Sequence, residues 1–463
     1  MITQRLGRVA AVSILGFVVV AVSLMQWAVF SRDDLRARDD NPRRVEDERA
    51  IWRGTLYDRS EVVLAQSVPS FRQASGRIAY RREYPHLDSV PVTGYYSLTY
   101  GTSGAEFAFD QDLRGANRIE LGQAVLNEVL NRPPRGTDIR LTVDQRLQAA
   151  AAAAFQGKQG AVIALDASTG AVRLLYSAPT YDPNDIDNDW EALIVSTGGP
   201  LLNRALQGRY QPGGALQFIW YAAMLANPQS LPSDLSLATA PVSLPNGATV
   251  TCNITDTPTN FVQVFASACP AIFADFVEAY PQFATDKLLA FGMLETPRLD
   301  GLLIAEAPTL VPLTELSDQE RRLAGIGQGQ LTVNLLQMAL AMAGIANAGN
   351  MPVAYLAEAR RDPDAAWETI LRESATQAVT TRETAMTIRE ALAQSAAALG
   401  LPENTYGHAS ISLSGTTQGS WFVGFAVLPN GETLSIATYV EASPRMTAMQ
   451  ISKQILQAAL VVQ

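Results

Sequence analysis

Acyl transfer by a serine needs a base beside the hydroxyl, and the sequence supplies few candidates for that base. A lysine three residues after a serine lies one helical turn away, so its amine can accept the hydroxyl proton. The chain contains only three lysines, and none follows a serine at this spacing: Phe155 precedes Lys158, Ala284 precedes Lys287 and Gln450 precedes Lys453. The sequence therefore contains no serine–lysine pair of this kind.

A row of serines near the C-terminus is a second arrangement that could do chemistry. Ser410, Ser412 and Ser414 alternate with other residues, so a strand would place all three on one face. His408, one of only two histidines, extends the same row. Such a row could form a hydrolase site, but we interpret it as the polar face of a strand that lines a pocket. The other histidine, His86, is expected at the surface.

The two cysteines, Cys252 and Cys269, are seventeen residues apart. No histidine, cysteine or acidic residue accompanies them at zinc-ligand spacing, so no metal site is expected. In an oxidising compartment, a disulfide between them would stabilise the fold by about 3 kcal/mol. Two separately buried thiols are the alternative, and the sequence alone leaves both possible.

Composition predicts a folded protein of two or three domains, because 463 residues exceed the usual size of one domain. Hydrophobic residues make up 48% of the chain and charged residues 17%, which is typical of globular proteins. The formal net charge of −10 argues against a nucleic-acid partner, since phosphate binding needs a basic surface. We expect no cofactor.

An uncharged segment covers residues 9–30 near the N-terminus. About 22 residues at 1.5 Å per residue are enough to cross a hydrocarbon core of about 30 Å. Cleaved signal peptides have a shorter apolar region and a small-x-small cleavage site, and neither feature is clear here. We therefore predict that residues 1–30 form a short tail and a retained, single-pass transmembrane helix.

The rest of the chain divides into two parts with different patterns. Residues 31–136 mix short apolar runs with Gly, Pro and Arg, which predicts an irregular, strand-rich region with a hairpin at 53–67. From residue 137 the pattern indicates an α/β body, in which Asp144 caps a helix. The other elements predicted there are strands at 139–143, 160–177, 408–415, 420–428 and 434–442, and helices after Pro212-Gly213, at 261–280, at 331–349 and at 446–462.

Several segments, taken in order, resemble those of class B penicillin-binding proteins over essentially the whole chain beyond the anchor. The most specific is GIGQGQLTVNLLQMALAMAGIANAGN at Gly325–Asn350, and others are RGTLYDR at Arg53–Arg59 and WFVGFA at Trp421–Ala426. The resemblance implies a strand-rich, non-catalytic pedestal at 31–136 and a transpeptidase-like domain at 137–463. That domain would be an α/β (α+β) fold of the serine β-lactamase type, with helices packed on an antiparallel sheet.

Catalysis in this family depends on three motifs, of which the first is a Ser-x-x-Lys that follows Tyr-x-Pro-Gly. Here Tyr210-Gln211-Pro212-Gly213 is followed by Gly214 in place of the serine and by Gln217 in place of the lysine. Glycine has no hydroxyl to acylate, and a glutamine amide cannot act as a base. The resemblance therefore implies that both roles are lost.

The second and third motifs are altered as well. In place of Ser-x-Asn the chain has Ala268-Cys269-Pro270, although an alternative register would use Ser267. In place of Lys-Thr-Gly it has Leu413-Ser414-Gly415, followed by Thr416, so the cation that would bind a substrate carboxylate is missing. We predict no catalytic residue at any of these positions. What we call the vestigial groove would be lined by Gly213, Gly214, Gln217, Cys269, Ser414, Gly415 and Thr416.

The resemblance implies a pseudoenzyme, a membrane-anchored scaffold or regulator of peptidoglycan or cell-envelope assembly. Its partners would be the membrane, through the N-terminal helix, and a polytopic glycan polymerase or another envelope-assembly protein. One alternative is a non-catalytic module that binds a peptide or glycan in the vestigial groove, and another is a D,D-transpeptidase with a non-standard site.

The orientation in the membrane does not follow from charge. Arg5 and Arg8 precede the predicted anchor, but more arginines follow it, so a count of positive residues favours the reverse topology. Long domains cross the membrane largely regardless of charge. The resemblance therefore places the large C-terminal region outside the cytoplasm.

Overall fold

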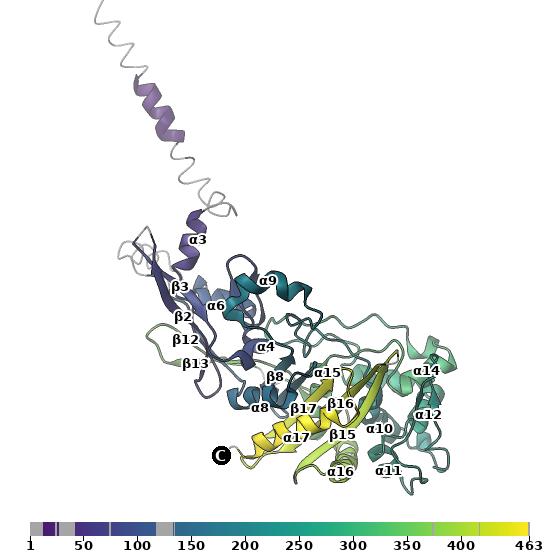
Figure 1. The fold of residues 1–463 in the computed structure, drawn as a ribbon. Helices are drawn as coiled ribbons and strands as arrows, with labels where there is room; N and C mark the ends of the chain where they lie inside the picture. Colours follow the sequence, from purple (N-terminus) through teal and green to yellow (C-terminus); the bar gives the residue numbers. More distant parts are fainter. Residues whose placement is uncertain are drawn as a thin grey trace, which may run out of the picture.

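The computed structural model describes residues 13–23, 26, 42–73, 76–116, 133, 135–372, 375–415 and 417–461. Residues 13–23 form a helix with exposed side chains, drawn apart from the body of the molecule in Figure 1. Within these described ranges, no helix is both long and apolar enough to cross a membrane. Much of the segment at 9–30 lies outside the described residues, so the transmembrane helix stays a prediction.

A six-stranded sheet in the order β13-β12-β6-β1-β2-β3 forms the end of the body nearest that helix (Figure 1). Strands β1 and β2 form the hairpin predicted at 53–67, and β1 also pairs in parallel with β6. The sheet therefore combines strands from both sides of residue 136, and a domain boundary there stays a prediction. The strands are β1 (Leu56–Tyr57), β2 (Val63–Arg72), β3 (Ile78–Glu83), β6 (Asp138–Leu141), β12 (Ala357–Arg361) and β13 (Trp367–Thr369).

A buried network of ion pairs lies beside this sheet in the predicted pedestal. The Arg53 guanidinium contacts Glu106 at 2.9 Å and Asp110 at 2.7 Å, and Arg82 contacts the other oxygen of Glu106 at 2.6 Å. Arg53, Arg82 and Glu106 are buried. Because burial removes the hydration of these charges, their mutual contacts must compensate for it. The surrounding elements are α3 (Pro42–Arg49), η2 (Leu87–Ser89), α4 (Val90–Thr93), β4 (Tyr96–Ser97), β5 (Gly101–Thr102), α5 (Gly104–Ala108) and α6 (Asp110–Arg114).

A five-stranded antiparallel sheet, β15-β16-β17-β7-β8, forms the centre of the second part (Figure 1). One face packs on α8 and α17 through side chains such as Phe155, Phe422 and Ile455, and the other packs on α15. The predicted α/β fold with helices packed on an antiparallel sheet is confirmed. Its elements are α8 (Gln145–Phe155), β7 (Gly160–Asp166), β8 (Val172–Ala178), α15 (Leu335–Ala346), β15 (Thr405–Ser414), β16 (Thr417–Val427), β17 (Thr433–Val440) and α17 (Thr447–Leu460).

Several helices begin where their sequence signals predict. Asp144 accepts a hydrogen bond from the Arg146 backbone at 3.0 Å and caps α8. Asn334 and Gln337 form a reciprocal capping box at the start of α15, which confirms the helix predicted at 331–349 with shorter ends. The predicted C-terminal helix is confirmed as α17.

The prediction of one helix at 261–280 is wrong, because the structure has two helices there, α11 (Phe261–Ala266) and α12 (Ala271–Ala279). Ala268 has a left-handed φ of 49°, and Pro270 has no backbone N–H, so the helix cannot run through this turn. The remaining elements are η4 (Pro183–Asp185), α9 (Ile186–Val195), η5 (Gly213–Leu216), α10 (Gln217–Ala226), η6 (Pro228–Ser230), β9 (Val242–Ser243), β10 (Thr249–Val250), α13 (Pro281–Ala290), η7 (Leu313–Glu315), α14 (Asp318–Gly325), β11 (Asn350–Pro352), β14 (Thr376–Ala378) and α16 (Arg382–Ala398).

Candidate functional site

The backbone at Gly213, where η5 begins, touches the edge strand β15 directly. The Gly213 N–H donates to the Gly327 carbonyl oxygen at 2.9 Å, and Tyr210 exchanges two backbone hydrogen bonds of 2.9 Å with Val333. Gly213 has a φ of 54°, and a β-carbon added there would lie 1.9 Å from the Ile411 carbonyl oxygen. Only glycine fits such a position, so the chain leading to Gly214 is held tightly against β15.

Gly214, which stands in place of the family's serine, faces Ser410 on β15. A β-carbon added to Gly214 would lie 2.9 Å from the Ser410 β-carbon and 3.6 Å from both the Ser410 hydroxyl oxygen and the Gln217 side-chain nitrogen. Non-bonded carbon atoms normally lie about 3.5–4.0 Å apart. The Ser410 side chain therefore takes part of the space that a side chain at position 214 would need.

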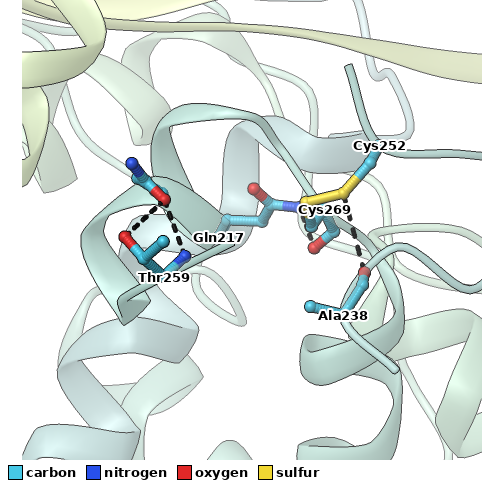
Figure 2. The surroundings of a disulfide bond; sticks show 6 residues. Gln217, Ala238, Cys252, Thr259 and Cys269 are labelled. Carbon is cyan, nitrogen blue, oxygen red and sulfur yellow. Dashed lines mark hydrogen bonds between the residues drawn. A yellow bond between two sulfur atoms is a disulfide. The ribbon is translucent and has the colours of Figure 1, made fainter. Parts of the chain in front are cut away.

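Gln217 connects the first altered motif to the second. It begins α10, it is buried, and its side-chain nitrogen donates to the Cys269 carbonyl oxygen at 3.4 Å (Figure 2). Its side-chain oxygen is buried without a hydrogen-bond partner among the described residues. A neutral amide can hold these two segments together, but it cannot take a proton from a nucleophile.

A disulfide joins Cys252 to Cys269, as in the first of the two alternatives for these residues (Figure 2). Cys269 is fully buried and Cys252 is half-buried, with its sulfur 3.6 Å from the Ala238 carbonyl oxygen. The cross-link fixes the segment before α11 to the turn between α11 and α12. The place of the second motif is therefore held covalently.

That turn offers no polar side chain at either end of the second motif. Ala268 is buried, and Pro270 directly precedes α12. Ser267, the alternative register, is half-buried, and its carbonyl oxygen accepts a hydrogen bond from the Asn253 backbone at 3.0 Å. Backbone contacts and the disulfide hold this segment, without side chains at positions 268 and 270 that could relay a proton.

The place of the third motif is the exposed end of β15. Leu413 is half-buried, Ser414 and Gly415 are exposed, and Thr416 lies outside the described residues. In the orientation that places its nitrogen toward β15, the Gln328 amide donates to the Leu413 carbonyl oxygen at 2.7 Å and accepts from the Leu413 N–H at 3.1 Å. The chain itself therefore occupies both backbone groups of the strand edge at Leu413.

His408 and Ser410 lie on one buried side of β15, and the ring of His408 stacks on Phe265 with 4.7 Å between ring centroids. Burial, helped by the nearby charge of Arg445, lowers the pKa of His408 to about 3, so the ring is neutral near pH 7. The Gly214 backbone weakly opposes this shift but forms no well-aligned hydrogen bond with the ring. Among the described residues, neither ring nitrogen nor the Ser410 hydroxyl has a hydrogen-bond partner. The two side chains are therefore not the bonded pair that a hydrolase uses.

The structure brings only part of the predicted groove together. Gly213, Gly214, Gln217 and Cys269 are neighbours, whereas Ser414 ends β15 and Gly415 follows it in a turn, both of them exposed. In the described part of the chain, no group of three or more His, Cys, Asp or Glu could hold a metal ion. The other histidine, His86, is half-buried beside η2.

Sequence reasoning missed two residues that shape the site. Ser410 was expected on the polar face of its strand, but its position against Gly214 depends on a contact between distant segments. Gln328 was not singled out, although it lies within the most family-like segment, Gly325–Asn350. Its position in that segment is the sequence signal that could have identified Gln328.

Two family models match the chain. The model described as penicillin binding protein transpeptidase domain matches residues 160–460, and the model described as penicillin binding protein A dimerisation domain matches residues 53–139. The peptidoglycan D,D-transpeptidase PbpA of Mycolicibacterium smegmatis is 33% identical over 391 residues, which cover 78% of this chain and 76% of that protein. PbpA of Mycobacterium tuberculosis is 30% identical over 383 residues, with coverages of 78% and 76%.

Solved structures resemble the whole described body. Penicillin-binding protein A from M. tuberculosis, as an imipenem acyl-enzyme complex, gives a TM-score of 0.79 at 27% identity and covers 89% of this chain and 99% of that chain. The D,D-transpeptidase domain of a peptidoglycan glycosyltransferase from Eggerthella lenta gives a TM-score of 0.76 at 23% identity, covering 89% and 98%, which is a likeness of fold alone.

Proposed function

This chain belongs to the class B penicillin-binding proteins, and on that premise we propose that it is a membrane-anchored member without transpeptidase activity. It acts as a scaffold or regulator in peptidoglycan assembly. A role in that process is supported by its similarity to proteins named peptidoglycan D,D-transpeptidases. The missing activity is supported by the residues of the site.

One observation carries the proposal: Gly214 has no hydroxyl, and Ser410 stands 2.9 Å from where a β-carbon at position 214 would be. Removing a serine nucleophile or its base lowers the rate of a serine protease by roughly 10⁶-fold. Here the nucleophile position and the base position, Gln217, are both altered. The β-lactam reaction fails for the same reason, because the acyl-enzyme would form on that serine.

Labelling with a fluorescent penicillin tests this proposal. The purified protein is expected to give no covalent band, while penicillin-binding protein A from M. tuberculosis, known as an acyl-enzyme with imipenem, serves as the positive control. A band on this chain that disappears after prior heat denaturation would refute the proposal, because it would reveal a folded, reactive nucleophile.

The alternative of a peptide-binding groove is disfavoured by the contact between Gln328 and Leu413. A peptide that binds by extending a sheet needs free backbone groups on an edge strand, and the Gln328 amide already occupies those of Leu413. Titration with muropeptides is expected to show no saturable binding. Binding that becomes tighter in Gln328→Ala would favour the groove module instead, because that change exposes the strand edge.

The scaffold role rests on what the pedestal retains. Its buried ion pairs of Arg53 and Arg82 with Glu106 are formed, although the groove lacks the residues for the family's chemistry. We propose that the pedestal and the N-terminal helix contact a polytopic glycan polymerase or another envelope-assembly protein, a choice of partner that rests on family analogy.

Crosslinking in the native membrane followed by capture tests the partner. The protein is expected to return an envelope-assembly protein, and Ser414→Ala should return the same one because the groove is not the contact. Capture that returns no such protein would contradict the scaffold role. Loss of the partner in Ser414→Ala would indicate binding through the groove.

The proposed location is the cell membrane, with the large C-terminal region outside the cytoplasm. The disulfide between Cys252 and Cys269 supports this placement, because disulfides persist mainly in oxidising compartments. Protease added to intact spheroplasts is expected to digest the body of the protein. Complete protection in sealed cells, with digestion only after lysis, would overturn this topology.

A further inference from the structure

A hollow of about 230 Å³ lies at the junction of the pedestal and the second domain. It borders β8, the edge of the central sheet opposite β15, so it is separate from the vestigial groove. The turn at Arg59 and Ser60 contributes the pedestal wall. Arg146, near the start of α8, and Arg173, on β8, contribute the other side. Its apolar lining consists of Leu147, Leu428, Leu434 and Ala459. We call this site the arginine hollow.

Cations outnumber acids in the lining of the arginine hollow. Among the described residues that line it there are three arginines, and the only acids are Asp144 and Glu432. Both oxygens of Asp144 are bonded by Arg146, at 3.1 and 2.8 Å. Glu432 lies between two cations, 2.6 Å from Arg173 and 3.5 Å from Arg59. The lining therefore carries one positive charge in excess.

A further acid, Asp58, lies outside the lining but close enough to act on the charge of Arg146, so the positive excess is confined to the lining itself. Asp58 is buried behind Arg59, and its oxygens accept hydrogen bonds from the backbone of Ser60, Val62 and Gln145 at 2.7, 2.8 and 3.1 Å. Those bonds hold the turn and the start of α8. Because Asp58 does not line the hollow, a bound molecule would meet the arginine donors and not this carboxylate, so the site depends on those donors rather than on net charge.

Among the described residues, several N–H groups of Arg59 and Arg146 have no acceptor. A guanidinium carries five N–H groups, and Arg146 uses two of them on Asp144 while Arg59 has one long contact with Glu432. The Arg146 side chain is 58% exposed and that of Arg59 is 33% exposed, so both can reach a bound molecule. Guanidinium groups suit carboxylate and phosphate oxygens, which accept two parallel hydrogen bonds.

We propose that the arginine hollow binds an oxyanion, a carboxylate or a phosphate, carried on a short apolar stem. Arg59 and Arg146 contact the oxyanion from the two sides of the junction, and the stem lies on Leu147, Leu428 and Leu434. Because Arg59 belongs to the pedestal and Arg146 to the second domain, the bound molecule fixes the two parts relative to each other. The proposal is independent of whether the vestigial groove has activity.

A series of probes tests the two halves of the proposed ligand in the purified full-length protein. Affinity for acetate, butanoate and hexanoate, measured by calorimetry or NMR titration, is expected to rise about fourfold per methylene group, as burial of the stem predicts. Hexyl phosphate in the same assay distinguishes a phosphate ligand from a carboxylate ligand. The proposal is overturned if neutral hexanamide binds as tightly as hexanoate, or if no charged probe binds saturably.

Variants test the role of the arginines. Arg59→Gln and Arg146→Gln are each expected to weaken binding of the tighter hexyl anion about tenfold, the effect of losing one charge-assisted hydrogen bond. Arg360→Gln is the matched control, because Arg360 is an equally charged, 52% exposed residue that pairs with Glu368 outside the hollow. Each ligand-free variant is first checked for an unchanged unfolding temperature.

Two outcomes for the variants contradict the site. If Arg360→Gln weakens binding as much as Arg146→Gln does, the effect reflects the net charge of the protein rather than the arginine hollow. If neither Arg59→Gln nor Arg146→Gln changes the affinity while both remain folded, the anion binds elsewhere. Either result would refute the proposal.

Discussion

The pedestal network and the vestigial groove are both buried and polar, but the pedestal holds charges in ion pairs whereas the groove holds neutral groups. In the pedestal, Arg53 and Arg82 hold opposite oxygens of Glu106 at 2.9 and 2.6 Å. Among the described residues, one nitrogen of Arg82, the side-chain oxygen of Gln217 in the groove and the hydroxyl of Ser410 beside the groove have no hydrogen-bond partner, but only Arg82 also belongs to an ion pair. An unpaired buried polar group costs about 1–3 kcal/mol.

The difference indicates which region the fold depends on. A buried network of ion pairs is costly to break, because removing one partner leaves a buried charge unpaired, so changes within it are expected to destabilise the protein strongly. A groove whose buried groups are unmatched gains little stability from them, and its polar groups can be replaced at small cost. The comparison predicts that the fold depends more on the pedestal network than on the polar groups of the groove, which Ser410 and Gln328 adjoin.

The largest effect is expected from breaking the pedestal network. Glu106→Gln leaves two arginines buried without a full counterion and should lower the free energy of unfolding by roughly 3–5 kcal/mol, measured by urea denaturation. Glu368→Gln is the control, because it removes an exposed pair with Arg360 and should cost less than about 1 kcal/mol. If the two changes lower the free energy of unfolding equally, the buried pedestal network is no more important for stability than an exposed ion pair, and its contrast with the groove fails.

The disulfide is expected to have the next largest effect. Replacing both Cys252 and Cys269 by serine should lower the free energy of unfolding by about 3 kcal/mol, because the unfolded chain gains freedom. A reducing agent should lower the stability of the unmodified protein similarly and leave the double variant unchanged. Insensitivity of the unmodified protein to reduction would show that the two sulfurs do not stabilise the fold through a bond.

The contact between Gly214 and Ser410 predicts a smaller effect with a specific rescue. Gly214→Ala should destabilise the protein by roughly 1–3 kcal/mol through overpacking, and adding Ser410→Gly should recover a large share of that loss. Gly213→Ala is the control, because its added carbon would meet the Ile411 backbone, which no side-chain change relieves. Equal stability of Gly214→Ala and the unmodified protein would show that position 214 has room for a side chain.

The effect that is smallest near neutral pH, and that grows only in acid, concerns His408. The pKa of His408 is about 3 in the folded protein against 6.5 in the unfolded chain, so the unfolded state binds more protons between these values. Stability is therefore fully present above about pH 6.5 and is lost as pH falls toward 3, by up to about 1.4 kcal/mol per pH unit. His408→Phe should remove this contribution, seen as a shallower fall in urea midpoints. An unchanged pH profile would mean that His408 is solvated.

Local features of the fold were predictable from the sequence. Asp144 and Asn334 cap helices as their residue types predict, and the alternation from His408 to Ser414 gave the correct strand. These features depend on residues close together in the chain. The break between α11 and α12 was not predicted, although Pro270 is a residue type that indicates the end of a helix.

Long-range contacts were not predictable from the sequence. The sheet that pairs β1 with β6 and β6 with β12 joins residues far apart in the chain, and nothing local marks those partners. In the groove, the places of Gly214 and Gln217 could be predicted from their motif. The positions of Ser410 and Gln328 against that motif required the folded structure.

Intact-mass spectrometry of the purified protein after incubation with imipenem tests the central claim most directly. The account predicts an unchanged mass under conditions in which penicillin-binding protein A from M. tuberculosis, known as an imipenem acyl-enzyme complex, gains one drug molecule. A stoichiometric adduct that peptide mapping places on Ser410, Ser412 or a residue of the vestigial groove would contradict it.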